Sequence, residues 1–266
     1  MSVLLCVVGR DVMGVTQLHD VVYIVCWRPS TIRRFNATTH QRLTDINVKD
    51  LGNPHDIAAC DPTSHVYVAD WSPECVWRVS SDGKDIKRWL PKTPSDTLRP
   101  HTLSVTSSRL LVTSQHINQL MQFDEAGDEL RRVRLPRYMR PEHAVESPSA
   151  TFIVSHLNTE LNYHWQVSEV NTEGQVLHQF TSSCVSSLGC PIHIAVDSQG
   201  NIFVADYHND RILLLDAQLV LRCVIIDKHQ LNYKPWPRRL CYNEQSGQLM
   251  VGLRLGDVAV FDVLER

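Results

Sequence analysis

The run CPIHIAVDSQGNIFVADYHNDRILLLD, residues 190–216, decides the fold of this chain. It divides into three short apolar segments, PIHIAV, NIFVAD and RILLLD, which are separated by the turn-forming stretches Ser-Gln-Gly and His-Asn-Asp. Proline suits the first position of a strand, where the ladder needs no backbone donor. The run therefore predicts three antiparallel strands, the first of which opens at Pro191.

The same pattern recurs along the whole chain. Six segments share one apolar strand position, and these positions lie 42 to 50 residues apart, at Ile24, Val68, Val112, Val154, Val204 and Val251. Five of the six upstream strands open at a proline, and a third strand follows each time. A period in this range is typical of a four-stranded propeller blade. We therefore predict an all-β, six-bladed β-propeller with four-stranded antiparallel blades.

The predicted blades leave the N-terminal strand unassigned and the sixth blade one strand short. The blades span about 12–48, 54–90, 100–135, 141–180, 191–226 and 237–263, and the sixth has only three strands. The N-terminal strand, residues 2–9, is the expected fourth partner, because pairing the two ends removes exposed sheet edges. Residues 1–266 are therefore expected to form a single propeller.

Residues 190–216 resemble an NHL repeat, whose pattern runs from a proline through Ile-Ala-Val-Asp and a Gly turn to Val-Ala-Asp and Arg-Ile. The segments PHDIAAC and VYVADW of the second blade are similar, with Cys60 in place of the first aspartate. The chain is thus similar to the C-terminal NHL domain of tripartite-motif (TRIM-NHL) proteins. The resemblance implies a binding face, a substrate-selecting role beside a ubiquitin ligase and, in some relatives, RNA binding.

Composition excludes several classes of protein. With 26 basic and 29 acidic side chains the net charge is -3, so no global field attracts nucleic acid or anionic membrane. The first apolar run, residues 3–8, is far shorter than the roughly 20 residues that cross a bilayer. Eight cysteines without a CxxC pair favour a reduced, cytoplasmic setting. Cys184 with Cys190, and the glycosylation sequon at Asn36, leave secretion open.

One face of the predicted ring collects the candidate binding residues, because loops at that end carry propeller function. They are Trp27, Arg28, His55, Trp71, His101, His116, His143, His156, His193, Tyr207, His208, Arg238, Arg239 and Arg254. The aspartates of the two Val-Ala-Asp segments, Asp70 and Asp206, are interpreted as structural, since the resemblance implies that they bond loop backbone. The basic stretch 131–140 is expected at the outer rim.

The histidines allow two interpretations. His55, His101, His143 and His193 could converge on the axis and bind zinc, or they could be hydrogen-bonding residues around a channel. His55 and His101 follow a proline by one residue and the other two by two residues, so their side chains should point differently. This offset disfavours one four-histidine site. His55 and His101 remain metal candidates because Pro-His segments resemble those of peptidyl-amidoglycine lyase.

The predicted function is a non-catalytic recognition module, without assigned catalytic residues or cofactor. The expected partner is a protein or peptide, with single-stranded or hairpin RNA as the other possibility, since arginines and tryptophans can hold phosphates and stack on bases. We expect a monomeric domain without membrane attachment. The alternative is a metal-dependent propeller enzyme similar to peptidyl-amidoglycine lyase.

Overall fold

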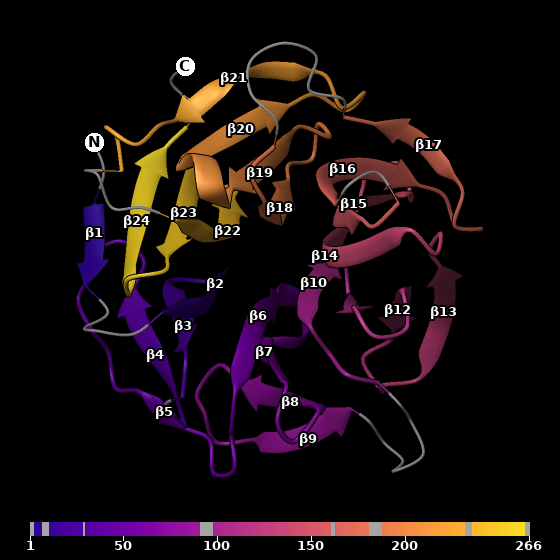
Figure 1. Cartoon of the computed structure of the whole chain (residues 1–266). Coiled ribbons are helices and arrows are strands. Elements are labelled where there is room, and N and C mark those ends of the chain that lie inside the picture. The colour runs from indigo at the N-terminus through magenta and orange to yellow at the C-terminus, as the bar shows by residue number, and fades with distance from the viewer. Residues whose placement is uncertain are drawn as a thin grey trace.

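A computed structural model describes residues 3–6, 11–28, 30–90, 98–160, 163–180, 188–231 and 236–263. Over these residues the chain forms a ring of six four-stranded antiparallel sheets, so the predicted six-bladed β-propeller is confirmed (Figure 1). Two 3-10 helices, Asp61–Thr63 and Tyr207–Asn209, interrupt the strands. Neither these nor any other described segment is a helix of the length and hydropathy that a bilayer crossing needs.

The blades follow one another in chain order. Blade one contains β2 (Val12–Leu18), β3 (Val21–Cys26), β4 (Thr31–Asn36) and β5 (Ile46–Asn47), and blade two β6 (Pro54–Cys60), β7 (His65–Asp70), β8 (Cys75–Ser80) and β9 (Ile86–Leu90). Blade three contains β10 (Thr102–Thr106), β11 (Arg109–Ser114), β12 (Gln119–Phe123) and β13 (Glu129–Arg134), and blade four β14 (Met139–Glu146), β15 (Phe152–Asn158), β16 (His164–Val170) and β17 (Val176–Gln179). Blade five contains β18 (Pro191–Val196), β19 (Ile202–Asp206), β20 (Arg211–Leu215) and β21 (Leu221–Ile226), and blade six β22 (Pro237–Asn243), β23 (Gln248–Leu253), β24 (Asp257–Asp262) and β1 (Val3–Cys6).

The two chain ends close the ring. The sixth sheet has the order β1-β24-β23-β22, and Leu5 of β1 lies opposite Val258 of β24 in an antiparallel pair. The N-terminal strand therefore supplies the missing edge strand, as predicted. The paired segment is Val3–Cys6, whereas residues 2 and 7–9 of the predicted strand lie outside the described residues.

Hydrophobic packing lies between neighbouring blades. Each of six buried clusters takes its side chains from two adjacent blades, because each sheet presents apolar faces to both neighbours. Trp77 packs in the cluster between blades one and two, and Trp89 in the next. Trp165 packs, partly buried, between blades four and five. These tryptophans lie between blades, as the sequence predicted.

Glycine shapes the predicted hairpin turns of blades two and four. Gly83 and Gly174 have φ values of +74° and +84°, in the left-handed region that favours glycine. At Gly174 a β-carbon would also lie 2.0 Å from the carbonyl oxygen of Arg134 in the preceding blade. The turn therefore both reverses the chain and sets the spacing of two blades.

Truncating Leu5 tests the ring closure. Its side chain is 2% exposed and packs with Val12 and Val258. We expect Leu5→Ala to lower the free energy of unfolding by about 2–4 kcal/mol, because it leaves a cavity at the closing seam. Leu130→Ala is the matched control, since Leu130 is 53% exposed on an outer strand. Equal denaturation midpoints for the two variants would show that β1 does not close the ring.

Candidate binding face

Each blade has an equivalent tripeptide at or next to the start of its inner strand, which is Pro-x-y in blades two to six and Val-Met-Gly in blade one. The strand starts at the proline in blades two, five and six, whereas β10 starts at Thr102 and β14 at Met139. In four of the proline blades a register shift separates the proline from y, and blade one has the same shift between Val12 and Gly14. A bulge of this kind re-aims neighbouring side chains. We call the x residues the face positions: Met13, His55, His101, Glu142, Ile192 and Arg238. We call the y residues the axial positions: Gly14, Asp56, Thr102, His143, His193 and Arg239.

Axial side chains bond each blade to the next. The backbone N–H of Leu103 donates to Asp56 Oδ2 at 2.9 Å, and Thr102 Oγ1 donates to the Glu142 carbonyl at 2.8 Å. Further round the ring, Ile194 N–H donates to His143 Nδ1 at 3.4 Å and Leu240 N–H to His193 Nδ1 at 3.3 Å. These bonds connect blades two to six in sequence.

Arg239 and Gly14 complete the circuit. The Arg239 guanidinium donates from Nε to the Met13 carbonyl at 2.6 Å and from Nη2 to the His55 carbonyl at 2.9 Å. At Gly14 a β-carbon would lie 2.6 Å from the backbone nitrogen of Ile57, so glycine allows blades one and two to meet. The axial positions therefore hold all six blades around one centre.

The charges at this centre are buried and matched. Asp56 is 1% exposed, with Arg239 Nε 3.6 Å from Oδ1 and His193 Nε2 3.6 Å from Oδ2. Burial alone would raise the pKa of Asp56, but the facing His193 and Arg239 hold it below its usual range. Burial lowers the pKa of Arg239 to about 10, so its guanidinium is still charged at neutral pH and neutralises the carboxylate.

The two axial histidines are neutral. Burial, above all, lowers the pKa of both His143 and His193. Because each Nδ1 accepts a backbone N–H, the ring proton lies on Nε2. His143 Nε2 then donates to the Leu103 carbonyl at 3.3 Å, and the two rings stack at 3.7 Å between centroids.

Asp56, His143 and His193 also have the side-chain types of a metal site. Their ligand atoms lie within 4.8 Å of one another, and this is the one such group among the described residues. A cation would have to replace the bonds from Ile194 and Leu240 and sit beside the Arg239 guanidinium. The donor set therefore fits a hydrogen-bonded centre better than a metal centre. His55 and His101 do not belong to the group.

Removing the Asp56 charge tests this centre. We expect Asp56→Asn to destabilise the protein by about 3–5 kcal/mol, because Arg239 would remain as an uncompensated buried charge. Glu125→Gln, an isosteric change at an exposed carboxylate, is the control. Chemical denaturation followed by tryptophan fluorescence measures both. If Asp56→Asn unfolds at the same denaturant concentration as the control, the buried pair does not hold the blades.

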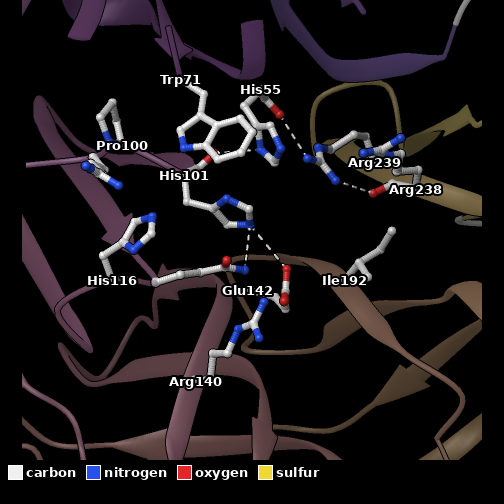
Figure 2. A pocket seen from close by; sticks show the side chains of 12 residues that line it. His55, Trp71, Pro100, His101, His116, Arg140, Glu142, Ile192, Arg238 and Arg239 are labelled. Atoms are coloured by element: carbon white, nitrogen blue, oxygen red, sulfur yellow. Dashed lines mark hydrogen bonds and ion pairs between the residues drawn. The ribbon is translucent and has the colours of Figure 1, made fainter. Parts of the chain in front are cut away.

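Above the axial positions, face positions line a cavity of about 330 Å³ (Figure 2). His55, His101, Glu142, Ile192 and Arg238 contribute to it from five different blades. The other lining residues are Trp71, Arg99, Pro100, Gln115, His116, Arg140 and Arg239. Trp71 lies at the edge of the cavity and is 46% exposed. Its ring contacts the His55 ring edge-on, with 6.2 Å between the ring centroids. The cavity thus combines guanidinium groups, imidazoles and one large aromatic surface.

The histidines inside this cavity have different environments. Burial and the neighbouring charges of His101, Arg239 and Arg238 lower the pKa of His55 to about 2, so that ring is neutral. Its Nδ1 lies 3.2 Å from the His101 carbonyl and donates to it. His101 Nε2 lies 3.2 Å from Glu142 Oε2 and 2.9 Å from Gln115 Nε2. Figure 2 marks the contact between His101 and Glu142 with a dashed line. His101 and Glu142 are therefore engaged with each other.

A second cavity of about 450 Å³ adjoins the first, because Ile192 and Arg238 line both. Trp27, Tyr207 and Arg254 line this second part. The Arg254 guanidinium lies 4.9 Å from the Trp236 ring centroid and donates to the Tyr207 hydroxyl at 3.0 Å. We call the two cavities together the arginine face. It is a continuous surface of arginines and aromatic rings across the end of the propeller.

The structure separates the predicted face residues by depth. Those that line the two cavities are Trp27, His55, Trp71, His101, His116, Tyr207, Arg238, Arg239 and Arg254. Arg28 lies 5.7 Å from the Trp27 ring, and His208 lies beside Tyr207. His143, His156 and His193 are buried below the face. Arg239 is also buried, and its donors are used by backbone carbonyls.

Asp70 and Asp206 are fully buried and bond the loops that enter the inner strands. Asp70 accepts the backbone N–H groups of Gly52 and Asn53 and the Trp77 indole N–H. Asp206 accepts the Gly189 N–H and pairs with Arg211 at 2.7 Å. Cys184, the other half of the suggested disulfide, lies outside the described residues, and Cys190 is a free, buried thiol.

Two arginines of the cavity were missed in the sequence. Arg99 and Arg140 each directly precede an inner-strand proline, and both line the first cavity. Arg140 had been expected at the outer rim, whereas β14 starts at Met139 and carries it to the face. The equivalent residues Asp11 and Cys190 line the second cavity. Aligning the blades on their prolines would have found this position.

Buried histidines make stability depend on pH. Burial lowers the pKa of His156 to about 4, whereas the unfolded chain titrates near 6.5. The unfolded state therefore takes up a proton first, so stability is complete above about pH 6.5 and falls as the pH drops. We expect His156→Gln to reduce the slope of unfolding free energy against pH, between about pH 6 and 4, by about 1.4 kcal/mol per unit. An unchanged slope in urea titrations would contradict this.

Comparison with known proteins supports the repeat and the ring. The family model described as NHL repeat matches residues 188–213. No curated protein matches the sequence. The chain thus carries an NHL repeat in the fifth blade of a six-bladed propeller, while a specific similarity to tripartite-motif proteins is not established.

Solved structures share the fold at low identity. A gluconolactonase, XC5397 from Xanthomonas campestris, aligns with a TM-score of 0.74 at 11% identity, over 97% of this chain and 88% of that one. Virginiamycin B lyase from Staphylococcus aureus, in a structure with quinupristin, gives 0.69 at 14% identity, over 97% and 82%. A chain of a nidogen/laminin complex gives 0.68 at 15% identity, over 88% and 85%. Enzymes and a binding protein thus share the architecture, and the similarity bears on the fold alone.

Proposed function

We propose that this propeller is a recognition module that binds an acidic peptide segment of a partner protein on the arginine face. The observation that carries the proposal is the first cavity, where Arg99, Arg140 and Arg238 border one hollow next to Trp71. Guanidinium forks suit carboxylates, and half-exposed tryptophans anchor interfaces. Both requirements of an acidic peptide with a bulky side chain are met within one cavity.

Arg140 is the cation best suited to meet such a ligand. It is exposed, and among the described residues no carboxylate pairs with it. Arg99 pairs with Glu74 at 2.9 Å, and Arg238 with Asp11 at 3.2 Å. These ion pairs hold the guanidinium groups of Arg99 and Arg238 at the cavity. A peptide carboxylate would therefore pair with Arg140, beside two arginines whose positions are fixed.

The charge balance favours a peptide over RNA. Glu142 and Asp11 lie within the face, and the whole chain carries a net charge of -3, so a polyanion would meet like charges along its length. One or two carboxylates placed in the cavity avoid that repulsion. A module of this kind would select the substrate of a ubiquitin ligase if another polypeptide supplied the ligase activity.

Binding of a fluorescein-labelled peptide in which two glutamates flank one tryptophan tests the proposal by fluorescence anisotropy. We expect the double variant Arg140→Ala, Arg238→Ala to weaken binding at least about tenfold, the equivalent of 1.4 kcal/mol. Arg42→Ala is the control, because Arg42 is an exposed arginine paired with Asp45 away from the face.

Single-stranded RNA of equal charge is measured in parallel. Tighter binding of the RNA, with a steep fall in affinity as salt increases, would replace the peptide proposal by nucleic-acid binding. Equal losses in the double variant and in Arg42→Ala would show that the cavity is not the binding site.

A further inference from the structure

A separate cavity of about 340 Å³ opens between blades five and six, at the end of the molecule opposite the arginine face. Inner strands β18 and β22 start at the arginine face with Pro191 and Pro237 and end at Val196 and Asn243. Asp197 and Glu244, which directly follow these two strands, line the cavity. The outer strand β21 supplies another wall through Cys223 and Val224. In Figure 1 these elements are the neighbouring orange and yellow blades.

The floor of this cavity is apolar and aromatic. Phe203 and Tyr242 face each other with ring centroids 4.7 Å apart, and Phe261 and Leu214 continue the surface. These side chains belong to the cluster between the two blades, so the cavity is an opening into packed core. Its volume suits one or two bulky side chains of a ligand.

Exposed apolar residues continue the floor onto the outer strand. Leu221 and Val224 of β21 are 41% and 43% exposed, and Val220 directly before the strand is 57% exposed. Contiguous exposed apolar residues of this kind mark interaction surfaces more often than scattered ones do. Val224 lines the cavity, whereas Val220 does not.

The polar rim of the cavity is acidic. Asp197, Glu244 and Asp262 line it, and no lysine, arginine or histidine is among the described lining residues. Glu244 is held by the backbone N–H and the hydroxyl of Ser198, and Asp197 by the N–H groups of Gln199 and Asn201. The carboxylates are therefore positioned by backbone donors.

The acidic rim makes the electrostatic potential in the cavity negative, and the pKa of Tyr242 reflects this. Burial and then the charges of Asp197 and Glu244 raise the pKa of Tyr242 at the floor. The nearest arginine on the outer strand, Arg222, pairs with Asp216 at 3.1 Å, and neither residue lines the cavity. Apolar floor and acidic rim together complement a ligand that is apolar and cationic at once.

We propose that this cavity is a second docking site, for a peptide segment in which bulky apolar side chains are flanked by arginine or lysine. The apolar side chains pack against the floor formed by Tyr242 and Phe203, and the flanking cations meet Asp197 and Glu244. The site is independent of the arginine face, since it lies at the other end of the blades and has the opposite charge preference.

Cys223 provides a direct readout, because this cavity-lining thiol is exposed, while Cys26, Cys60, Cys75 and Cys190 are buried. The full chain is alkylated with iodoacetamide, with and without the capped peptide Gly-Arg-Leu-Phe-Arg-Gly, and modification is located by mass spectrometry. We expect saturating peptide to slow alkylation of Cys223 about tenfold. A peptide with glutamate in place of both arginines should give no protection.

Two matched variants localise the binding. Val224→Lys places a cation at the cavity wall, and Val220→Lys places the same cation four residues away at an exposed residue outside the cavity. By isothermal titration calorimetry we expect at least a tenfold weaker Kd for Val224→Lys, about 1.4 kcal/mol, and less than a twofold change for Val220→Lys. Because both side chains are exposed, neither change should disturb folding.

Three results would overturn the proposal. They are equal protection by the glutamate peptide, equal weakening in the two lysine variants, and self-association of the chain that Val224→Lys abolishes, which would assign the surface to a second copy. Loss of acidic-peptide binding at the arginine face would leave this result unaffected, so the two sites are tested separately.

Discussion

The structure depends on the axial positions, where one side chain from each of blades two to six bonds the backbone of the next blade. Asp56, His143 and His193 accept backbone N–H groups across blade boundaries, and Arg239 donates to two carbonyls. Hydrophobic clusters between the blades supply most of the favourable burial, but apolar contact is non-directional and does not select a register. Directional bonds at the axis set how far each blade lies from the centre. Because they are buried, leaving any of them unmade costs more than it would at the surface.

Because the axial positions hold the blades together, the adjacent face positions are available for binding. At the face positions the five proline blades carry histidine twice, glutamate, isoleucine and arginine, and all five residues line one cavity. A bulge presents four of them and the segment before β10 presents His101, so their identities can differ without altering the ring. At the opposite end, turns of the same rigid scaffold also present side chains to a cavity, but these side chains are acidic. The turns after β18 and β22 carry the carboxylates Asp197 and Glu244 beside an apolar floor. One scaffold thus offers a cationic hollow at one end and an anionic one at the other.

Sequence periodicity predicted the fold well because it depends on local pattern. Short, continuous apolar strands, prolines near strand starts and glycine turns are determined by neighbours along the chain, and closure follows from counting strands. The candidate face was predicted less well. The sequence analysis placed all four histidines on one face. His55 and His101 occupy face positions, whereas His143 and His193 occupy axial positions. Their different distances from the proline already indicated this difference. Arg99 and Arg140 were missed because they directly precede the prolines, whereas the candidate residues of the inner strands follow them.

By itself the sequence determined the number of blades, their order and the strand that closes the ring, since backbone hydrogen bonding and burial of both sheet faces leave one arrangement for such a repeat. Only the tertiary structure decided which polar residues are buried. Depth depends on bulges that shift side chains by one position and on partners far away in the chain, such as the carbonyls of Met13 and His55 that hold Arg239. Of the adjacent arginines, Arg238 stays partly exposed at the binding face, whereas Arg239 is buried below it and holds the axis, because only the ring brings its partners together.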